Sequence, residues 1–143
     1  MTIELDRISI GRPSLQVALA GDVPSAELPI VVRRPTLRDA QRARSLLRAG
    51  TRDTANFIVA LEVEVAIAPS AASARAAVAH ISDELEGATV RYVGTPSGLA
   101  TLIRDIYAAE VADAVILIPL DGSATENRLR ELVLPAFIEQ QAA

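Results

Sequence analysis

A short apolar run between two amphipathic segments near the end of the chain limits the possible folds more than any other part of the sequence. Residues 114–118 read Ala-Val-Ile-Leu-Ile, which is typical of a parallel strand covered on both faces. Before this run, apolar residues recur at helical spacing at Leu99, Leu102, Ile103, Ile106 and Tyr107. A second helical segment follows the run. Helix, buried strand, helix is the order of an α/β protein.

The rest of the chain continues this alternation. Strands are expected at residues 15–20, 30–33, 57–67 and 89–93, and helices at 36–49, 70–86 and from 95 onwards. Thr36, Ser70 and Thr95 are expected N-caps, Pro96 suits the first helical turn, and Gly50 is expected to end its helix. The pattern predicts a single α/β domain over residues 1–143, with a parallel sheet built of right-handed βαβ units.

Composition narrows the class of protein. Half of the 143 residues are hydrophobic and the mean hydropathy is +0.30, which favours a buried interface between subunits. No apolar run reaches the roughly 18 residues of a membrane span, and residues 1–6 do not begin a signal peptide. Cysteine is absent, which excludes disulfides and fits a cytoplasmic location. A formal charge of −4 and only two Phe and two Tyr argue against nucleic acid as a partner.

Several short segments resemble the C-terminal end of the luciferase-like flavin-dependent monooxygenases. They are Gly94-Thr95-Pro96 before a helix, Ala112-Asp113-Ala114 before the apolar strand, and Leu132-Val133-Leu134-Pro135 in the last helix. Ala114 departs from the glycine of that family. Weaker resemblance extends to residues 34–41 and 16–21. The resemblance implies an incomplete, half TIM-barrel-like parallel sheet, with the family's N-terminal half absent.

Half a barrel would have two unpaired sheet edges and an exposed inner face. At roughly 25 cal/mol per Å2, several hundred exposed Å2 of apolar surface would cost many kcal/mol. We therefore expect a homo-oligomer, with a dimer favoured, or a complex with a full-length relative. Two halves could pair edge to edge or stack their open faces. The alternative is that residues 1–13 cover the sheet.

Functional groups of a (βα)8 enzyme lie at the C-terminal ends of its strands. Here these ends carry residues 20–22, 33–34 and 119–122. By the resemblance, the residues that would hold the phosphate of FMN or of a deazaflavin are Ala20, Gly21, Ser25, Arg33 and Arg34. In the family a serine stands close behind the glycine. Here Asp22 follows Gly21, and its negative charge would repel a phosphate. The alternative to a phosphate site is that Gly21 and Asp22 form a plain turn and that Arg33 and Arg34 are solvated.

Other polar residues carry weaker hypotheses. Glu62 and Glu64 share one strand face about 7 Å apart and could divide acid and base roles. They could equally lie on a half-polar face or meet arginines across an interface. His80 is the one histidine, and with no cysteine it forms no metal-site spacing, so no metal is expected. Thr95 could bind an anion but suits a cap better. No nucleophile elbow, Walker loop or dinucleotide fingerprint is present.

Three functions remain open at this point. The first is a truncated luciferase-like protein derived from a flavin-dependent oxidoreductase and active as an oligomer. The second is a non-catalytic partner or binding subunit that has lost the flavin site. The third is unrelated small-molecule binding by a small α/β domain. The resemblance supports ancestry in the family, but the Asp22 substitution counts against a complete active site.

Overall fold

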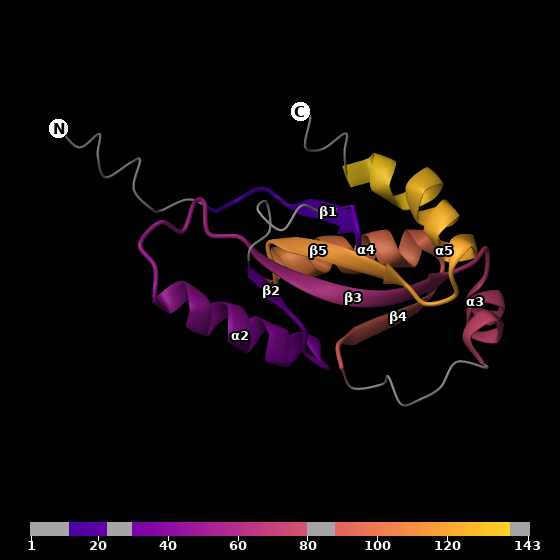
Figure 1. The fold of residues 1–143 in the computed structure, drawn as a ribbon, viewed down its shortest axis with the longest axis horizontal. Coiled ribbons are helices and arrows are strands. Elements are labelled where there is room, and N and C mark those ends of the chain that lie inside the picture. Colours follow the sequence, from indigo (N-terminus) through magenta and orange to yellow (C-terminus); the bar gives the residue numbers. More distant parts are fainter. Residues whose placement is uncertain (1–11, 23–29, 80–87, 138–143) are drawn as a thin grey trace.

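The computed structural model describes residues 12–22, 30–79 and 88–137. Helices and strands alternate along most of this part of the chain (Figure 1). The strands are β1 (Gln16–Leu19), β2 (Ile30–Val32), β3 (Val59–Ile67), β4 (Val90–Gly94) and β5 (Ala114–Pro119). The helices are α2 (Leu37–Ala49), α3 (Ala71–Val78), α4 (Pro96–Ala108), α5 (Ser123–Arg128) and the π-helical segment η2 (Leu129–Val133).

The five strands form one sheet in which every pairing is parallel. Strand β3 lies in the middle, with β5 and then β1 on one side. Its other side is shared by β2, which pairs with residues 59–61, and β4, which pairs with residues 63–67. The predicted α/β class and the parallel sheet with alternating helices are confirmed, in an arrangement consistent with part of a TIM-type barrel. Strand order does not follow chain order, since β1 lies beside β5.

The helices begin where their capping residues indicate. The hydroxyl oxygens of Thr36, Ser70 and Thr95 accept hydrogen bonds from the backbone N–H three residues on, at 3.1, 3.1 and 3.2 Å. Gly50 ends α2 with φ −92°, so it does not use the left-handed conformation expected of a C′ glycine. Helix α3 ends at Val78. We expected it to extend to residue 86, and residues 80–87 lie outside the described part of the chain.

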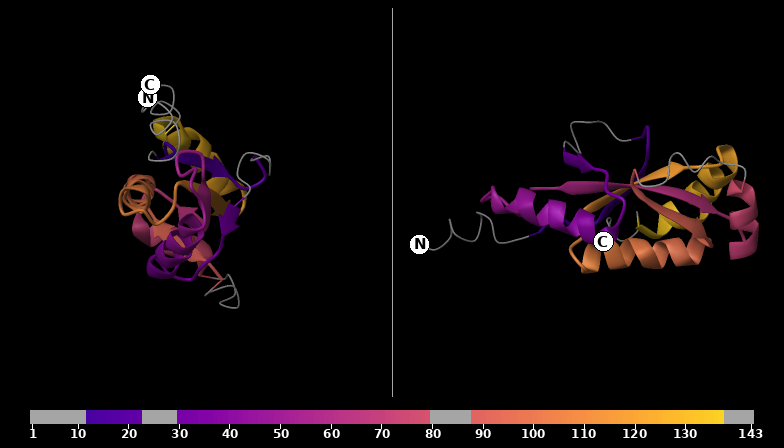
Figure 2. Two further views of the ribbon diagram at one scale, coloured as in Figure 1. Left: turned by 90° about the vertical axis from the view of Figure 1, so that its left-hand side faces the viewer. Right: turned by 90° about the horizontal axis from the view of Figure 1, so that it is seen from below.

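Alternation along β3 separates its two faces. The odd-numbered side chains, from Val59 to Ile67, belong to the main hydrophobic core. Helices α2, α4 and η2 cover this face with residues such as Ala43, Ile103 and Val133. In the right-hand view of Figure 2, α4 (orange) lies on one side of the sheet, which we call the helix face.

The opposite face, called here the inner face, holds the even-numbered residues of β3. Ala60 and Ala66 are small and fully buried, whereas Glu62 and Glu64 are charged. Strand β5 adds Ile116, which is also buried. In a barrel this face would line the interior, where side chains lie in layers. Its charged residues therefore need partners in place of water.

The C-terminal helical segment changes its winding before a proline. Pro135 has no N–H to donate to the carbonyl of Glu131, and its ring would collide with that carbonyl in a regular α-helix. The π-helical turn Leu129–Val133 lies directly before it and widens the helix there. Leu129 and Val133 stay buried. Among the described residues no helix is long and apolar enough to cross a membrane.

Gly94 is required by the tyrosine ring that packs on it. A Cβ at Gly94 would lie 2.8 Å from the Cζ atom of Tyr92, inside any normal contact distance. The hydroxyl of Tyr92 donates to the carbonyl of Thr95 at 3.0 Å, which holds the ring in place at the start of α4. Gly94→Ala should therefore lower the free energy of unfolding by about 1–3 kcal/mol, the usual cost of overpacking.

Urea denaturation measures this effect, and Gly50→Ala is the matched control. A Cβ at Gly50 would meet only the Leu47 carbonyl oxygen, at an ordinary 3.7 Å. We expect that variant to be unchanged or more stable by about 0.4–1 kcal/mol, through the entropy of the unfolded chain. Equal stability of the two variants would show that Tyr92 does not pack on Gly94.

Candidate functional site

The residues expected to hold a phosphate lie at two different edges of the sheet. Ala20 and Gly21 follow β1 and are exposed, and Gly21 has a φ of +93° that suits glycine. Arg33 and Arg34 follow β2 at the other edge. Because β5 and β3 lie between them, the two pairs are separated by about 14 Å, three strand spacings. Ser25 lies outside the described residues.

Arg33 is engaged on the inner face by the two glutamates of β3. It donates to the Glu62 carboxylate, and its second terminal nitrogen lies 3.8 Å from Glu64. Arg91 of β4 donates to the same Glu64 carboxylate at 3.2 and 3.3 Å. The Glu64 side chain is only 7% exposed. Four side chains therefore form one ionic cluster, called here the inner-face cluster, on the described part of the inner face.

This cluster decides between the interpretations of Glu62 and Glu64. The carboxylates meet arginines, as one interpretation expected, but the arginines belong to the same chain and not to an interface. Glu62 accepts a charge-assisted hydrogen bond from Arg33, and Glu64 accepts two from Arg91. Because arginine side chains engage both carboxylates, the arrangement favours charge balance over catalysis.

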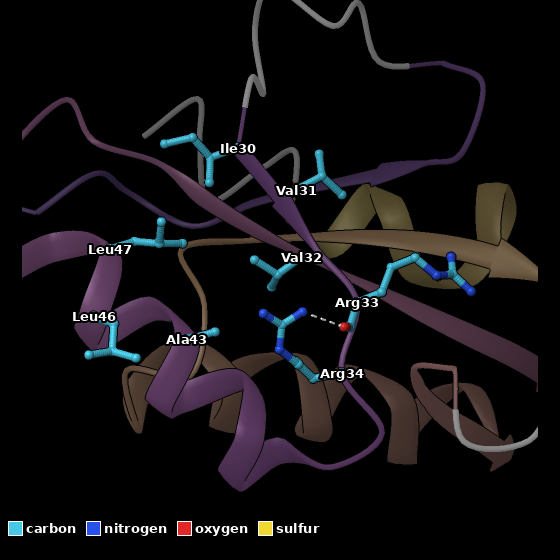
Figure 3. Close-up of a pocket in the computed structure, with 8 residues that line it drawn as sticks. All are labelled: Ile30, Val31, Val32, Arg33, Arg34, Ala43, Leu46 and Leu47. Carbon is cyan, nitrogen blue, oxygen red and sulfur yellow. Dashed lines mark hydrogen bonds between the residues drawn. The ribbon is translucent and has the colours of Figure 1, made fainter.

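Arg34 points to the opposite side of the strand end from Arg33 (Figure 3). Its guanidinium folds back and donates to the Arg33 carbonyl at 2.7 Å. It lies beside an open surface pocket of about 590 Å3 between β2 and α2. Apolar side chains form most of the wall of this edge pocket: Ile30, Val31, Val32, Ala43, Leu46 and Leu47. An arginine at the rim of an apolar pocket suits a ligand with an apolar body and an anionic group.

The placement of these residues can be compared with what a flavin phosphate would need. It would need several N–H donors converging on one point. In one chain, Arg33 is paired with glutamates, Arg34 lies at the edge pocket, and Gly21 lies across the sheet. Asp22 next to Gly21 pairs with Arg130 at 3.0 Å, which leaves a carboxylate and not a donor at that turn. The described residues of a single chain therefore do not form one phosphate site.

A second ionic cluster lies at the opposite, N-terminal ends of the strands. Asp113, directly before β5, is fully buried. Its carboxylate accepts from Arg12 at 2.9 Å, from Arg44 at 2.9–3.2 Å and from the Val59 N–H at 3.1 Å. Burial raises the pKa of Asp113, but the hydrogen bonds from Arg44, Arg12 and the Val59 N–H outweigh it and hold the pKa below its usual value.

Arg12 also fastens the first described residues onto the end of α4. Its guanidinium stacks over the Tyr107 ring, 3.7 Å from the ring centre, and donates to the Tyr107 carbonyl at 2.6 Å. The Tyr107 hydroxyl donates in turn to the Pro13 carbonyl at 2.6 Å. This cluster lies at the N-terminal ends of the strands, away from the end where barrel enzymes place their chemistry. We assign it a role in stability.

The sequence reasoning gave no role to Asp113, Arg12 or Arg44. One signal was available, because Asp113 is the single charge in the apolar run 111–118. A carboxylate at the start of a buried strand needs a cationic partner. The partners themselves could not be named, since they lie 69 and 101 residues away along the chain.

The remaining candidates contribute little to a site. Thr95 caps α4, which is the role that the sequence favoured over anion binding. His80 lies outside the described residues. Asp121 follows β5 and has one buried carboxylate oxygen without a hydrogen-bond partner. Within residues 12–22, 30–79 and 88–137, no group of three or more acidic or histidine side chains could hold a metal ion.

Comparison with known proteins gives a fold but no family. No family model matches the sequence, and no curated protein matches it significantly. The crystal structure of riboflavin lyase (RcaE), solved with modified FMN and the substrate riboflavin, is similar with a TM-score of 0.52 and 15% sequence identity. The match covers 94% of this chain but only 40% of that protein's chain. At this identity the similarity shows the fold alone.

Proposed function

We propose that this chain is a shortened relative of the luciferase-like flavin-dependent oxidoreductases that binds a flavin, FMN or a deazaflavin, as an oligomer. The observation that carries the proposal is the similarity of 94% of the chain to a riboflavin lyase structure that contains modified FMN. The motifs at Gly94-Thr95-Pro96 and Ala112-Asp113-Ala114 point in the same direction. The edge pocket, apolar with Arg34 at its rim, supplies a surface for a ligand of this chemistry.

An oligomer is part of the proposal because the residues expected to bind the phosphate lie far apart within one chain. Gly21 and Arg34 lie at opposite edges of the sheet. In a flavoprotein the cofactor supplies the redox chemistry, and the protein binds it, orients it and excludes water. Here Arg34 would bind the phosphate, and the apolar wall of the edge pocket would exclude water from one side of the ligand.

A second function is favoured by a separate observation. The inner-face cluster neutralises Arg33 with Glu62 and Glu64, which leaves no free cation on the described inner face for a phosphate. That arrangement supports a non-catalytic subunit, a homo-oligomer or a partner of a full-length relative, that keeps the fold and has lost the flavin site.

Flavin titrations separate these two functions. Adding the purified protein to FMN should change the flavin fluorescence saturably, and Arg34→Ala should weaken FMN binding about tenfold to a hundredfold, the loss of one hydrogen bond to a charged group. Riboflavin has no phosphate, so its affinity should be the same for both proteins. Native mass spectrometry then gives the number of flavins per assembly.

Arg38→Ala is the matched control, because it removes the same charge from the exposed start of α2 and Arg38 does not line the edge pocket. It should bind FMN as the unmodified chain does. If the unmodified protein binds neither FMN nor a deazaflavin at millimolar concentration, the flavin proposal fails and the non-catalytic subunit remains.

A further inference from the structure

Helix α2 is held against the described structure from one side only. Its buried Arg44 binds the Asp113 carboxylate at 2.9 Å. Arg42 and Leu46 each lie two residues from Arg44, so at 3.6 residues per turn they stand on the opposite side of the helix. Both side chains are exposed, Leu46 by 78%. This side of α2 is therefore open within the described part of the chain.

Two hollows meet at Leu46. The first is the edge pocket, where Figure 3 shows Leu46 and Leu47 on α2 and Val31 on β2. The second is an open hollow of about 360 Å3 on α2, lined by Gln41, Arg42, Ser45 and Leu46. Because Leu46 lines both hollows, it stands between them. We call the two hollows and Leu46 together the α2 surface.

Positive charge lies on both sides of this leucine. Arg34 stands at the rim of the edge pocket, and Arg42 lines the second hollow. Neither guanidinium forms an ion pair with a carboxylate of the described residues, including Asp39 one turn before Arg42. The hydrogen bond of Arg34 goes to a neutral backbone carbonyl, which leaves its charge uncompensated. The α2 surface is therefore apolar at its centre and positively charged on both sides.

We propose that the α2 surface docks an acidic amphipathic helix of a partner protein. Apolar side chains of that helix, four residues and hence about 6 Å apart, enter the two hollows beside Leu46, and its carboxylates pair with Arg42 and Arg34. Laying the apolar face of a helix into a groove is a recurring mode of recognition. The inference does not depend on flavin binding, although a flavin and the helix would exclude each other at the edge pocket.

The place of α2 in the fold favours a helix as the occupant. In a (βα)8 barrel the helices form a closed outer ring, so each helix has another on both sides. Here α2 follows β2, which lies at one outer end of the strand order, and the ring of described helices stops at α2. A helix docked beside Arg42 and Leu46 would take the place of the next member of that ring.

An added strand is disfavoured at the same place. Strand β2 has only three residues, and Pro29 and Pro35 flank it in the sequence. Proline has no N–H to donate, and short strands with prolines nearby are among the means by which proteins protect a sheet edge from pairing. The side chains of α2, and not the backbone of β2, are therefore expected to make the contact.

Charge and shape also disfavour other occupants. A two-fold contact between copies would place the same arginines against each other. The phosphates of a nucleic acid would meet the exposed Leu46 at the centre of the surface. A lipid bilayer has no side chains to enter the two hollows. An acidic helix fills the hollows and compensates both charges.

A labelled peptide tests the proposal directly. The probe is a fluorescein-labelled peptide of about 20 residues, longer than the length at which isolated helices are marginal. Leucines recur in it at i, i+4 and i+7, and glutamates flank this stripe. Its fluorescence anisotropy should rise saturably as the full chain is added. A peptide of the same design with lysine in place of every glutamate should bind about tenfold more weakly.

Leu46→Glu should weaken binding of the glutamate peptide about thirtyfold, because it removes the central apolar contact and adds a like charge. Leu132→Glu is the matched control, because Leu132 is 58% exposed on the C-terminal helical segment, at the other end of the molecule from α2 (Figure 1). It should bind the peptide as the unmodified chain does. Since both positions are exposed, both variants should keep the circular dichroism spectrum of the unmodified chain.

Reversing one charge gives a second, independent measurement. Arg42→Glu should bind the glutamate peptide about tenfold more weakly and the lysine peptide about tenfold more tightly than the unmodified chain. Arg75→Glu makes the same change at an exposed position of α3 and should leave both affinities unchanged. If Arg75→Glu shifts them as much as Arg42→Glu does, only net charge matters and the proposal fails.

The remaining outcomes also decide the question. Absence of saturable binding of both peptides up to about 1 mM overturns the proposal, as does equal affinity of Leu46→Glu and the unmodified chain. Vesicles of phosphatidylcholine and phosphatidylserine and a DNA duplex are tested alongside. If either binds in place of the peptides and Arg42→Glu abolishes that binding, the surface belongs to lipid or nucleic acid. These mixtures contain no flavin, so the flavin titrations succeed or fail independently.

Discussion

Asp113→Asn should lower the free energy of unfolding by about 3–5 kcal/mol, the cost of leaving a buried charge without its partner. The Asp113 carboxylate faces three sets of donors, from Arg12, Arg44 and the Val59 N–H. Arg44 is only 2% exposed, so water cannot replace the lost negative charge. The new amide N–H2 would also point at donors. Urea denaturation at a fixed protein concentration measures the loss as a lower midpoint.

Glu110→Gln is the matched control, because Glu110 is the other acidic partner of Arg44. Its carboxylate lies 3.6 Å from Arg44, but its side chain is 65% exposed. Exposed pairs contribute about 0–1 kcal/mol, so this variant should remain close to the unmodified protein. A loss of less than about 1 kcal/mol in Asp113→Asn would contradict the buried cluster and place Arg44 in contact with solvent.

The same cluster makes stability depend on pH in the acid range. The folded-state pKa of Asp113 lies below its ordinary value of 3.8 because the hydrogen bonds from Arg44, Arg12 and Val59 outweigh the effect of burial. The stabilisation is therefore complete above that ordinary value and is lost as the pH falls through the folded pKa. The difference in stability between the unmodified chain and Asp113→Asn should shrink on acidification below about pH 4. A difference that stays constant would mean that folding does not lower the pKa of Asp113.

Arg91→Leu should lower the free energy of unfolding by about 3 kcal/mol, because it removes the nearer cation from a buried carboxylate. Glu64 is 7% exposed and would keep only Arg33, whose nitrogen lies 3.8 Å away. Arg33 is itself partly exposed and already bonded to Glu62. Thermal or urea unfolding at neutral pH measures the change.

The double variant Glu64→Leu/Arg91→Leu tests whether the pair serves only to balance charge. Replacing a whole buried ion pair with apolar side chains is often neutral or stabilising. We therefore expect the double variant to lie within about 1 kcal/mol of the unmodified protein, with a coupling of about 2 kcal/mol between the two sites. If the double variant is as unstable as Arg91→Leu, the pair is needed for the geometry of the inner face.

Local signals in the sequence predicted most of the elements. Thr36 and Thr95 cap helices where their spacing indicated, because a cap depends on an N–H only three residues away. The alternation along 59–67 separates an apolar side, which lies in the core, from a side that carries Glu62 and Glu64. Gly50 ends α2 as predicted, with an ordinary φ of −92°.

The candidate site was less predictable for a physical reason. Arg33 and Glu62 were both singled out in the sequence, but as parts of separate hypotheses, and the structure joins them in one ion pair. Ala20 and Arg34 were placed in one site, and the structure puts them at opposite edges. Which side chains meet across a sheet depends on the order of the strands. Local sequence patterns do not determine that order.

The sequence by itself determined the α/β class, the parallel strands, the helix starts and the side of β3 that enters the core. These properties depend on the spacing of side chains within a few residues of one another. Only the tertiary structure decided that β1 lies beside β5, that Asp113 meets Arg12 and Arg44, and that β1 and β2 form the outer ends of the strand order within the described residues. Such contacts join segments up to 101 residues apart, and they are fixed by how whole faces pack and by which buried charges can be compensated.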